Sequence, residues 1–149
     1  GHLNIIERAR KLVDTLIVGI GVNVEKQSLF TLDERLKLVR QVTQKWGNVQ
    51  VQTFEGLAVK FVRECEARVM IRGVRPLTDI AGEFTVMMAN RQLDPEIETV
   101  FLMADEEFSH VSSTLIKQIA EFSNDEMLVR FVPVEIIGQL RQKLSLADS

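Results

Sequence analysis

Hydrophobic and polar residues follow two different patterns along this chain, which predict helices and strands in alternation. Apolar residues recur at helical spacing in some segments and form short runs, rich in β-branched residues, in others. The predicted helices cover residues 3–13, 31–46, 57–66, 79–93, 112–122 and 133–144. The predicted strands cover residues 16–22, 49–54, 69–74 and 98–104. Because such strands pair in parallel through right-handed crossovers, we expect one doubly wound α/β domain, residues 1–149, with a mostly parallel sheet.

Local signals mark the ends and faces of several helices. Thr31 and Glu34 form a capping-box pattern at the start of helix 31–46, and Gly47 follows its end. The apolar stripes expected to face the core are Ile5, Ile6, Ala9, Leu12 and Val13 in the first helix, Ile80, Phe84, Met87 and Met88 in helix 79–93, and Leu115, Ile116, Ile119, Ala120 and Phe122 in helix 112–122.

Two arginines lie at the carboxyl end of strand 69–74, where open α/β sheets bind their ligands. Guanidinium groups bind phosphate in a bidentate manner, so Arg72 and Arg75 together favour a polyanionic ligand. The alternative is that one arginine pairs with Asp79 or Glu83, which share a helix face, while the other is solvated.

Three further features place candidate phosphate ligands in loops or at helix amino ends. His2 stands at the amino end of helix 3–13, where it can donate to a phosphate that also meets free backbone amides. Lys26 lies in the loop after strand 16–22, and its alternative role is that of a solvated lysine. The Ser-Ser-Thr sequence at residues 112–114 opens a helix, where hydroxyl groups either cap the helix or bind a nucleotide phosphate.

Composition limits the function without defining it. The chain has 149 residues, 46% hydrophobic and 26% charged, which is typical of one soluble globular domain. Its net charge of −3 predicts binding neither to nucleic acid nor to an anionic membrane, and no apolar run approaches the roughly 20 residues that span a bilayer. Cys65 is the only cysteine, so no disulfide forms within the chain and we expect a reducing, cytoplasmic setting.

Six short motifs run through the chain. They are Gly1-His2, F-T-L-D-E-R at 30–35, R-G-V-R at 72–75, M-A-N-R at 88–91, P-E-I-E-T-V-F-L-M at 95–103 and F-S-H-V-S-S-T at 108–114. In order and spacing they resemble the bacterial phosphopantetheine adenylyltransferase family over essentially the whole chain. The resemblance implies a Rossmann-like nucleotidyltransferase that transfers the adenylyl group of ATP to 4'-phosphopantetheine with Mg²⁺, giving dephospho-coenzyme A and pyrophosphate. It also implies a homohexamer and feedback by coenzyme A.

The resemblance assigns roles to individual residues. His2 would stabilise charge on the α-phosphate of ATP as a hydrogen-bond donor, and Asp79 would support the site. The residues implied for 4'-phosphopantetheine are Lys26, Ala58 and Arg72. Those implied for ATP are His2, Gly73, Val74, Arg75, Glu83, Phe108, Ser109, His110, Val111, Ser112, Ser113 and Thr114. No protein nucleophile is expected, because the acceptor phosphate attacks the α-phosphorus in line. No residue is assigned as a metal ligand.

The sequence departs from the family pattern at its start. The family has a first strand and a phosphate-binding turn before the glycine-histidine pair, and neither is among these 149 residues. Since loss of a central parallel strand exposes apolar faces and unpaired edges, we expect the sequence to lack an amino-terminal segment. Two alternatives stay open: a related nucleotidyltransferase with another phosphate acceptor, and a non-catalytic ATP-binding domain if the strand is truly absent.

Overall fold

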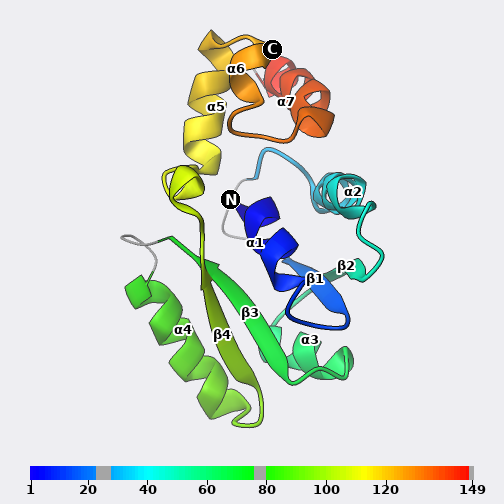
Figure 1. Cartoon of the computed structure of the whole chain (residues 1–149), viewed down its shortest axis with the longest axis vertical. Coiled ribbons are helices and arrows are strands. Elements are labelled where there is room, and N and C mark those ends of the chain that lie inside the picture. Colours follow the sequence, from blue (N-terminus) through cyan, green and yellow to red (C-terminus); the bar gives the residue numbers. More distant parts are fainter. Residues whose placement is uncertain (23–27, 76–79, 148–149) are drawn as a thin grey trace.

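A computed structural model of the chain describes residues 1–22, 28–75 and 80–147 (Figure 1). Its strands are β1 (Leu16–Gly21), β2 (Val49–Phe54), β3 (Val69–Val74) and β4 (Glu98–Met103). Its helices are α1 (His2–Ala9), α2 (Leu32–Thr43), α3 (Ala58–Glu64), α4 (Ile80–Leu93), α5 (Ser113–Phe122), α6 (Asp125–Leu128) and α7 (Val134–Ala147), with a 3₁₀ helix η1 (Glu106–Phe108). All the predicted strands are present, and β2 and β3 have the predicted bounds.

The strands form two parallel pairs. β1 pairs with β2 from Leu16 opposite Val49 onward, and β3 pairs with β4 from Val69 opposite Glu98. The predicted α/β class with parallel strands and intervening helices is therefore confirmed. The pairs do not join into one ladder, because no described strand is hydrogen-bonded to both β1 and β3.

Helix α1 lies against β3 and β4 and approaches the backbone of β3 closely. A Cβ atom added at Gly73 would lie 2.9 Å from Cγ1 of Ile5, which is shorter than a normal contact. A glycine is thus required at this position so that the helix can pack on the strand. Gly73 is a strand residue with a packing role, whatever ligand lies nearby.

Two hydrophobic clusters of buried residues each join a few of the described elements. One joins α3 to β3 and to the start of β4 through Val59, Val62, Met70 and Ile97. The other joins the carboxyl-terminal helices and contains Ala120, Leu128, Val132, Ile137 and Leu140. Leu128 of α6 has no exposed surface. The sequence did not predict α6, since four residues are too few to show a helical period.

Several predicted helix ends are corrected by the structure. Helix α1 ends at Ala9 instead of residue 13, so the predicted core residue Leu12 is 64% exposed. Helix α2 ends at Thr43, before Trp46, whose ring packs under the guanidinium of Arg10. The boundaries moved because residues 10–15 and 44–48 form tight turns that connect helix to strand, and apolar spacing does not reveal where such turns begin.

The capping box at the start of α2 is confirmed. The backbone amide of Glu34 donates to the Thr31 hydroxyl at 3.2 Å, and the backbone amide of Thr31 donates to Oε2 of Glu34 at 2.7 Å. Two backbone amides that would otherwise lack a hydrogen-bond partner at the start of α2 are thus paired. The F-T-L-D-E-R motif therefore has a structural role in beginning this helix.

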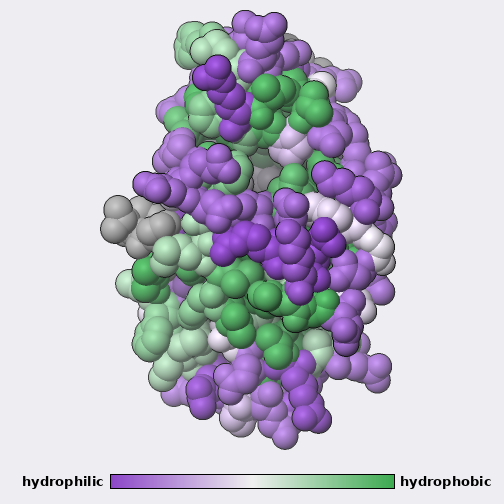
Figure 2. Space-filling model, viewed as in Figure 1, coloured by the Kyte–Doolittle hydropathy of each residue, from purple (hydrophilic) through white to green (hydrophobic). Residues whose placement is uncertain are grey.

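The predicted core stripe of α4 is wrong. Ile80, Phe84 and Met88 are 51%, 54% and 46% exposed, and no residue of α4 is buried. Phe122, at the end of α5, is 89% exposed, against the same kind of prediction. Apolar spacing shows that a helix has an apolar face, but the described elements do not cover that face. Figure 2 shows hydrophobic surface gathered over the half of the molecule that contains β3, β4 and α4.

Candidate functional site

The candidate site lies at the edge where β3 and β4 end together. Val74 is opposite Met103, and the backbone amide of Ala104 donates to the carbonyl oxygen of Val74 at 2.9 Å. From this shared point the chain continues to Arg75 in one direction and to Asp105 in the other. Segments from two strands therefore diverge from one place, which is the usual position of a ligand site in an open α/β sheet.

Three polar residues attach the first turns of α1 to the segment after β4. Nδ2 of Asn4 donates to Oδ2 of Asp105 at 2.7 Å, and Nη1 of Arg8 donates to Oδ1 of Asp105 at 3.0 Å. The Asp105 amide donates back to Oδ1 of Asn4 at 3.2 Å, and Arg8 also donates to the carbonyl oxygen of Met103. We call Asn4, Arg8 and Asp105 the α1–β4 clamp. It holds the amino end of α1, where His2 is the first helical residue, beside the chain that leads to residues 108–114.

Sequence reasoning missed the clamp. Asn4 and Arg8 are four residues apart on one face of α1, which is a weak signal of a shared partner. Their partner lies about a hundred residues away in sequence, and single-sequence patterns carry no information about such a distance.

Arg72 is held by Glu83 in a two-point ion pair. Nε of Arg72 lies 2.9 Å from Oε2 of Glu83, and Nη2 lies 2.9 Å from Oε1. The hydrogen bonds with Glu83 raise the pKa of Arg72 above its ordinary value, so the guanidinium stays charged. The alternative that an arginine of this pair is bound by a helix carboxylate is thus correct for Arg72. Its side chain comes from within β3, on the opposite face from Gly73.

Residues 108–114 combine structural and exposed groups. Ser112 is the N-cap of α5, because its hydroxyl accepts from the backbone amide of Leu115 at 3.2 Å. The hydroxyl of Ser109 donates to the Glu106 carbonyl at 2.8 Å. Ser113 and Thr114, in the first turn of α5, are exposed. The predicted capping role is therefore confirmed for Ser112, and the first-turn hydroxyls face solvent.

Other predicted ligands are placed in the chain as follows. His110 packs edge-on against the ring of Phe131, with centroids 6.4 Å apart. Ala58 begins α3 directly after β2 and is half-buried. Lys26 and Asp79 lie outside the described residues. The amino-terminal helix α1, Arg75 and the segment after β4 thus meet at one edge, and Arg72 lies within β3, three residues before Arg75 (Figure 1).

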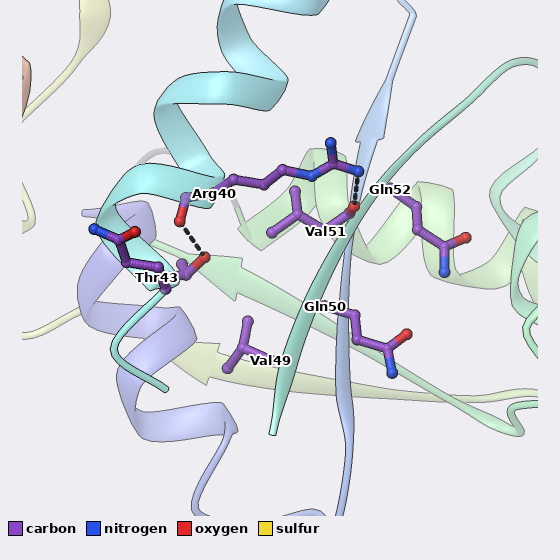
Figure 3. Close-up of a pocket in the computed structure, with 7 residues that line it drawn as sticks. Arg40, Thr43, Val49, Gln50, Val51 and Gln52 are labelled. Atoms are coloured by element: carbon purple, nitrogen blue, oxygen red, sulfur yellow. Dashed lines mark hydrogen bonds between the residues drawn. The ribbon is translucent and has the colours of Figure 1, made fainter. Parts of the chain in front are cut away.

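A pocket of about 440 Å³ lies elsewhere, between α2 and β2 (Figure 3). Arg40, Thr43 and Gln52 are among its lining residues, and none of that lining is a predicted ligand. Nη2 of Arg40 donates to the carbonyl oxygen of Val51 at 3.2 Å, so this arginine satisfies the open edge of β2. The pocket therefore belongs to the packing of helix against strand.

The described residues contain few other reactive groups. They include no cluster of three or more His, Cys, Asp or Glu side chains that could hold a metal ion. Burial, and then the charge of Glu64, raise the pKa of the Cys65 thiol, which agrees with a structural rather than a reactive cysteine. No described helix is long and apolar enough to cross a membrane.

Parallel strands joined by helices carry the candidate phosphate ligands at one strand edge. Residues 1–119 match the family model described as cytidylyltransferase-like, so the chain is an α/β nucleotidyltransferase. Two curated relatives narrow the class. A phosphopantetheine adenylyltransferase of Rhodopirellula baltica is 66% identical over 146 residues, which is 97% of this chain and 82% of the relative. The enzyme of the same name from Clostridium botulinum strain Hall is 44% identical over 145 residues, covering 97% of this chain and 87% of that protein. The chain belongs to the phosphopantetheine adenylyltransferase family.

Proposed function

We propose that the edge formed by β3, β4 and α1 transfers the adenylyl group of ATP to 4'-phosphopantetheine, giving dephospho-coenzyme A and pyrophosphate. The observation that supports the proposal is the α1–β4 clamp, which ties the first turns of α1, the helix that begins at His2, to Asp105 directly after β4. In-line attack by one phosphate on another needs position and positive charge more than covalent chemistry. A site made of rigidly held donors supplies both.

Each group then has a distinct role. His2 donates a hydrogen bond to the α-phosphate of ATP and stabilises the charge that develops there. Arg75, with the amides and exposed hydroxyls at the start of α5, binds the remaining ATP phosphates, since a helix amino end favours anions. Arg72, with Lys26, binds the phosphate of the acceptor, and Ala58 lies against its pantetheine arm.

Magnesium fits this site as a companion of ATP. Mg²⁺ keeps most of its water and is usually held by substrate phosphates with one or two carboxylates, so it needs no cage of protein ligands. Of the candidate carboxylates described at the site, Asp105 and Glu83 are both engaged with arginines. We therefore propose that Mg²⁺ arrives bound to ATP, where it neutralises charge on the phosphates.

Assembly and regulation complete the proposal. The exposed apolar residues of α4, among them Phe84 and Met88, support a homohexamer in which other copies cover this helix. Coenzyme A contains the same phosphopantetheine arm as the product, which supports its action as a competing feedback ligand. The single cysteine supports a reducing compartment such as the cytoplasm.

Pyrophosphate release tests the activity. Purified chain is incubated with ATP and Mg²⁺, with and without 4'-phosphopantetheine, and we expect release only when the acceptor is present. Release that instead needs nicotinamide mononucleotide or another phosphate would assign the chain to a different acceptor. Binding of ATP without release under any condition would mean that the chain acts as a nucleotide-binding domain.

A further inference from the structure

Helix α5 begins with candidate ATP ligands and ends far from them. Ser112 is its N-cap, Ser113 and Thr114 are exposed in its first turn, and its last residue is Phe122. A helix of 10 residues spans about 15 Å. In Figure 1 the helix leads from the segment after β4 to α6 and α7. A group that holds the carboxyl end of α5 therefore sets the direction of the helix without touching its amino end.

Arg141 of α7 connects the carboxyl end of α5 to the start of α6. Nη1 of Arg141 donates to the carbonyl oxygen of Ala120, and Nη2 donates to that of Ser123. Nε donates to Oδ1 of Asp125, in the first turn of α6, at 3.1 Å. Ser123, the C-cap of α5, has an extended backbone conformation instead of the left-handed one that closes many helices. Arg141 therefore supplies hydrogen bonds to carbonyl groups at a helix end, where the backbone itself provides few.

The helix that carries Arg141 is fixed by the carboxyl-terminal hydrophobic cluster. Leu140, the residue before Arg141, is 4% exposed and belongs to the same cluster as Ala120 of α5. Hydrophobic attraction is not directional, so it keeps α5 against α7 without fixing the rotation of α5 by itself. The hydrogen bonds from Arg141 depend on distance and angle, and they add this constraint. Phe131, between α6 and α7, also packs against His110 in the segment that leads to α5.

We propose that Arg141 is a positioning residue for ATP: by fixing the carboxyl end of α5, it aims the first turn of this helix at the nucleotide phosphates. The inference rests on the proposed function, in which the amino end of α5 binds ATP. Arg141 acts through α5 and contacts no substrate. A small rotation of α5 weakens the hydrogen bonds that its first turn donates to phosphate, because such bonds need a narrow range of angles. Binding of 4'-phosphopantetheine, proposed for Arg72 and Ala58, does not depend on α5.

The variant Arg141→Met removes all three hydrogen bonds and keeps an unbranched side chain. The matched control is Lys143→Met, two residues further along α7. The Lys143 side chain is 28% exposed, against 34% for Arg141, but Lys143 pairs with Glu34 of α2 at 2.8 Å and not with α5. Both variants remove one positive charge, so a difference between them does not come from net charge. A second control, Leu128→Ala, destabilises the cluster but removes no hydrogen bond from α5.

Isothermal titration calorimetry measures the dissociation constants of α,β-methylene-ATP and of 4'-phosphopantetheine for the full chain and each variant. For Arg141→Met we expect the ATP analogue to bind about 2- to 10-fold more weakly, which is the range expected for impaired hydrogen bonds to a ligand. This variant should bind 4'-phosphopantetheine as the original protein does. Both controls should bind both ligands as the original protein does, and urea unfolding reports the stability that each variant has lost.

The results separate the inference from the proposed function. Unchanged affinity of Arg141→Met for the ATP analogue, a loss of affinity for both substrates, or an equal loss in either control would overturn the inference. If the original protein does not bind the ATP analogue, the inference and the proposed function are both overturned. If it binds the analogue but uses a phosphate acceptor other than 4'-phosphopantetheine, the proposed function fails, whereas the loss of ATP affinity in Arg141→Met still supports the inference.

Nuclear magnetic resonance of the original protein gives a second readout that needs no folded variant. Because coupling between two sites is reciprocal, a nucleotide whose binding depends on the hydrogen bonds of Arg141 must also stabilise those bonds. The side-chain N–H signals of Arg141 should therefore exchange more slowly with water when the ATP analogue saturates the protein. Saturation with 4'-phosphopantetheine should leave this exchange unchanged. Exchange that does not respond to the ATP analogue would overturn the proposal.

Discussion

Removing Asp105 from the α1–β4 clamp should lower turnover much more than stability. Asp105→Ala removes the carboxylate that accepts from both Asn4 and Arg8. The Arg8 and Asp105 side chains are 38% and 49% exposed, so water screens their attraction. An exposed ion pair contributes about 0–1 kcal/mol, and the hydrogen bond from Asn4 adds about 1 kcal/mol. We therefore expect the free energy of unfolding to fall by only about 1–2 kcal/mol.

The effect on turnover comes from the position of His2. Asn4 lies two residues after His2, so the clamp fixes this end of α1 relative to Asp105. A displacement of about 1 Å in a group-transfer site can lower the rate by about 10²-fold. Such a loss corresponds to about 2.7 kcal/mol in the activation barrier, more than the expected change in stability.

Two assays on the same preparation test this reasoning. Pyrophosphate release with saturating ATP and 4'-phosphopantetheine gives kcat, and urea unfolding gives stability. The control is Glu64→Ala, which removes an ion pair to Lys60 whose side chains are 61% and 74% exposed. We expect the control to keep its turnover. A kcat for Asp105→Ala within about threefold of the original, with both variants folded, would refute the idea that the clamp positions His2.

Four further substitutions have defined outcomes. His2→Ala should lower kcat by about 10²- to 10³-fold and leave the urea midpoint unchanged, because it removes a transition-state donor from an exposed position. Leu128→Ala should lower the free energy of unfolding by about 2–5 kcal/mol, since Leu128 is fully buried, whereas Phe122→Ala, at an 89% exposed side chain, should change it little in the same urea assay. Hydrogen bonds from Arg63 hold the pKa of Asp94 below its ordinary value. The ionised Asp94 therefore adds to the free energy of unfolding above the carboxyl pKa of the unfolded chain, and this stabilisation is lost as pH falls through the folded pKa. In Asp94→Asn the free energy of unfolding should therefore fall less steeply as pH is lowered into the acid range. An unchanged slope would contradict this.

The sequence was informative wherever the signal was local. Short β-branched runs located each strand, because a strand buried by flanking helices has to be apolar over a few consecutive residues. Thr31 and Glu34 predicted their own hydrogen bonds, since both partners of a capping box lie within one turn. The carboxyl ends of β3 and β4 followed from strand polarity, so the edge that holds the candidate site was predictable as well.

Contacts between distant segments were not predictable in this way. The clamp joins residues about a hundred positions apart, and the exposed stripe of α4 depends on which elements lie beside it. Gly73 shows the same limit. In the sequence it is part of a candidate ligand motif, whereas the structure shows that Ile5 of α1 leaves no room for a Cβ atom there. The reason for a glycine at position 73 is thus a neighbour, Ile5, that lies close only in the folded chain.

Two separate polar connections flank the strand end at the candidate site. The register between β3 and β4 ends with Val74 opposite Met103. The clamp joins the segment after β4 to α1, and the pair of Arg72 and Glu83 joins β3 to α4. The two connections share no residue. Losses of transition-state stabilisation from Asp105→Ala and Glu83→Gln should therefore add, because substitutions without common partners are usually independent.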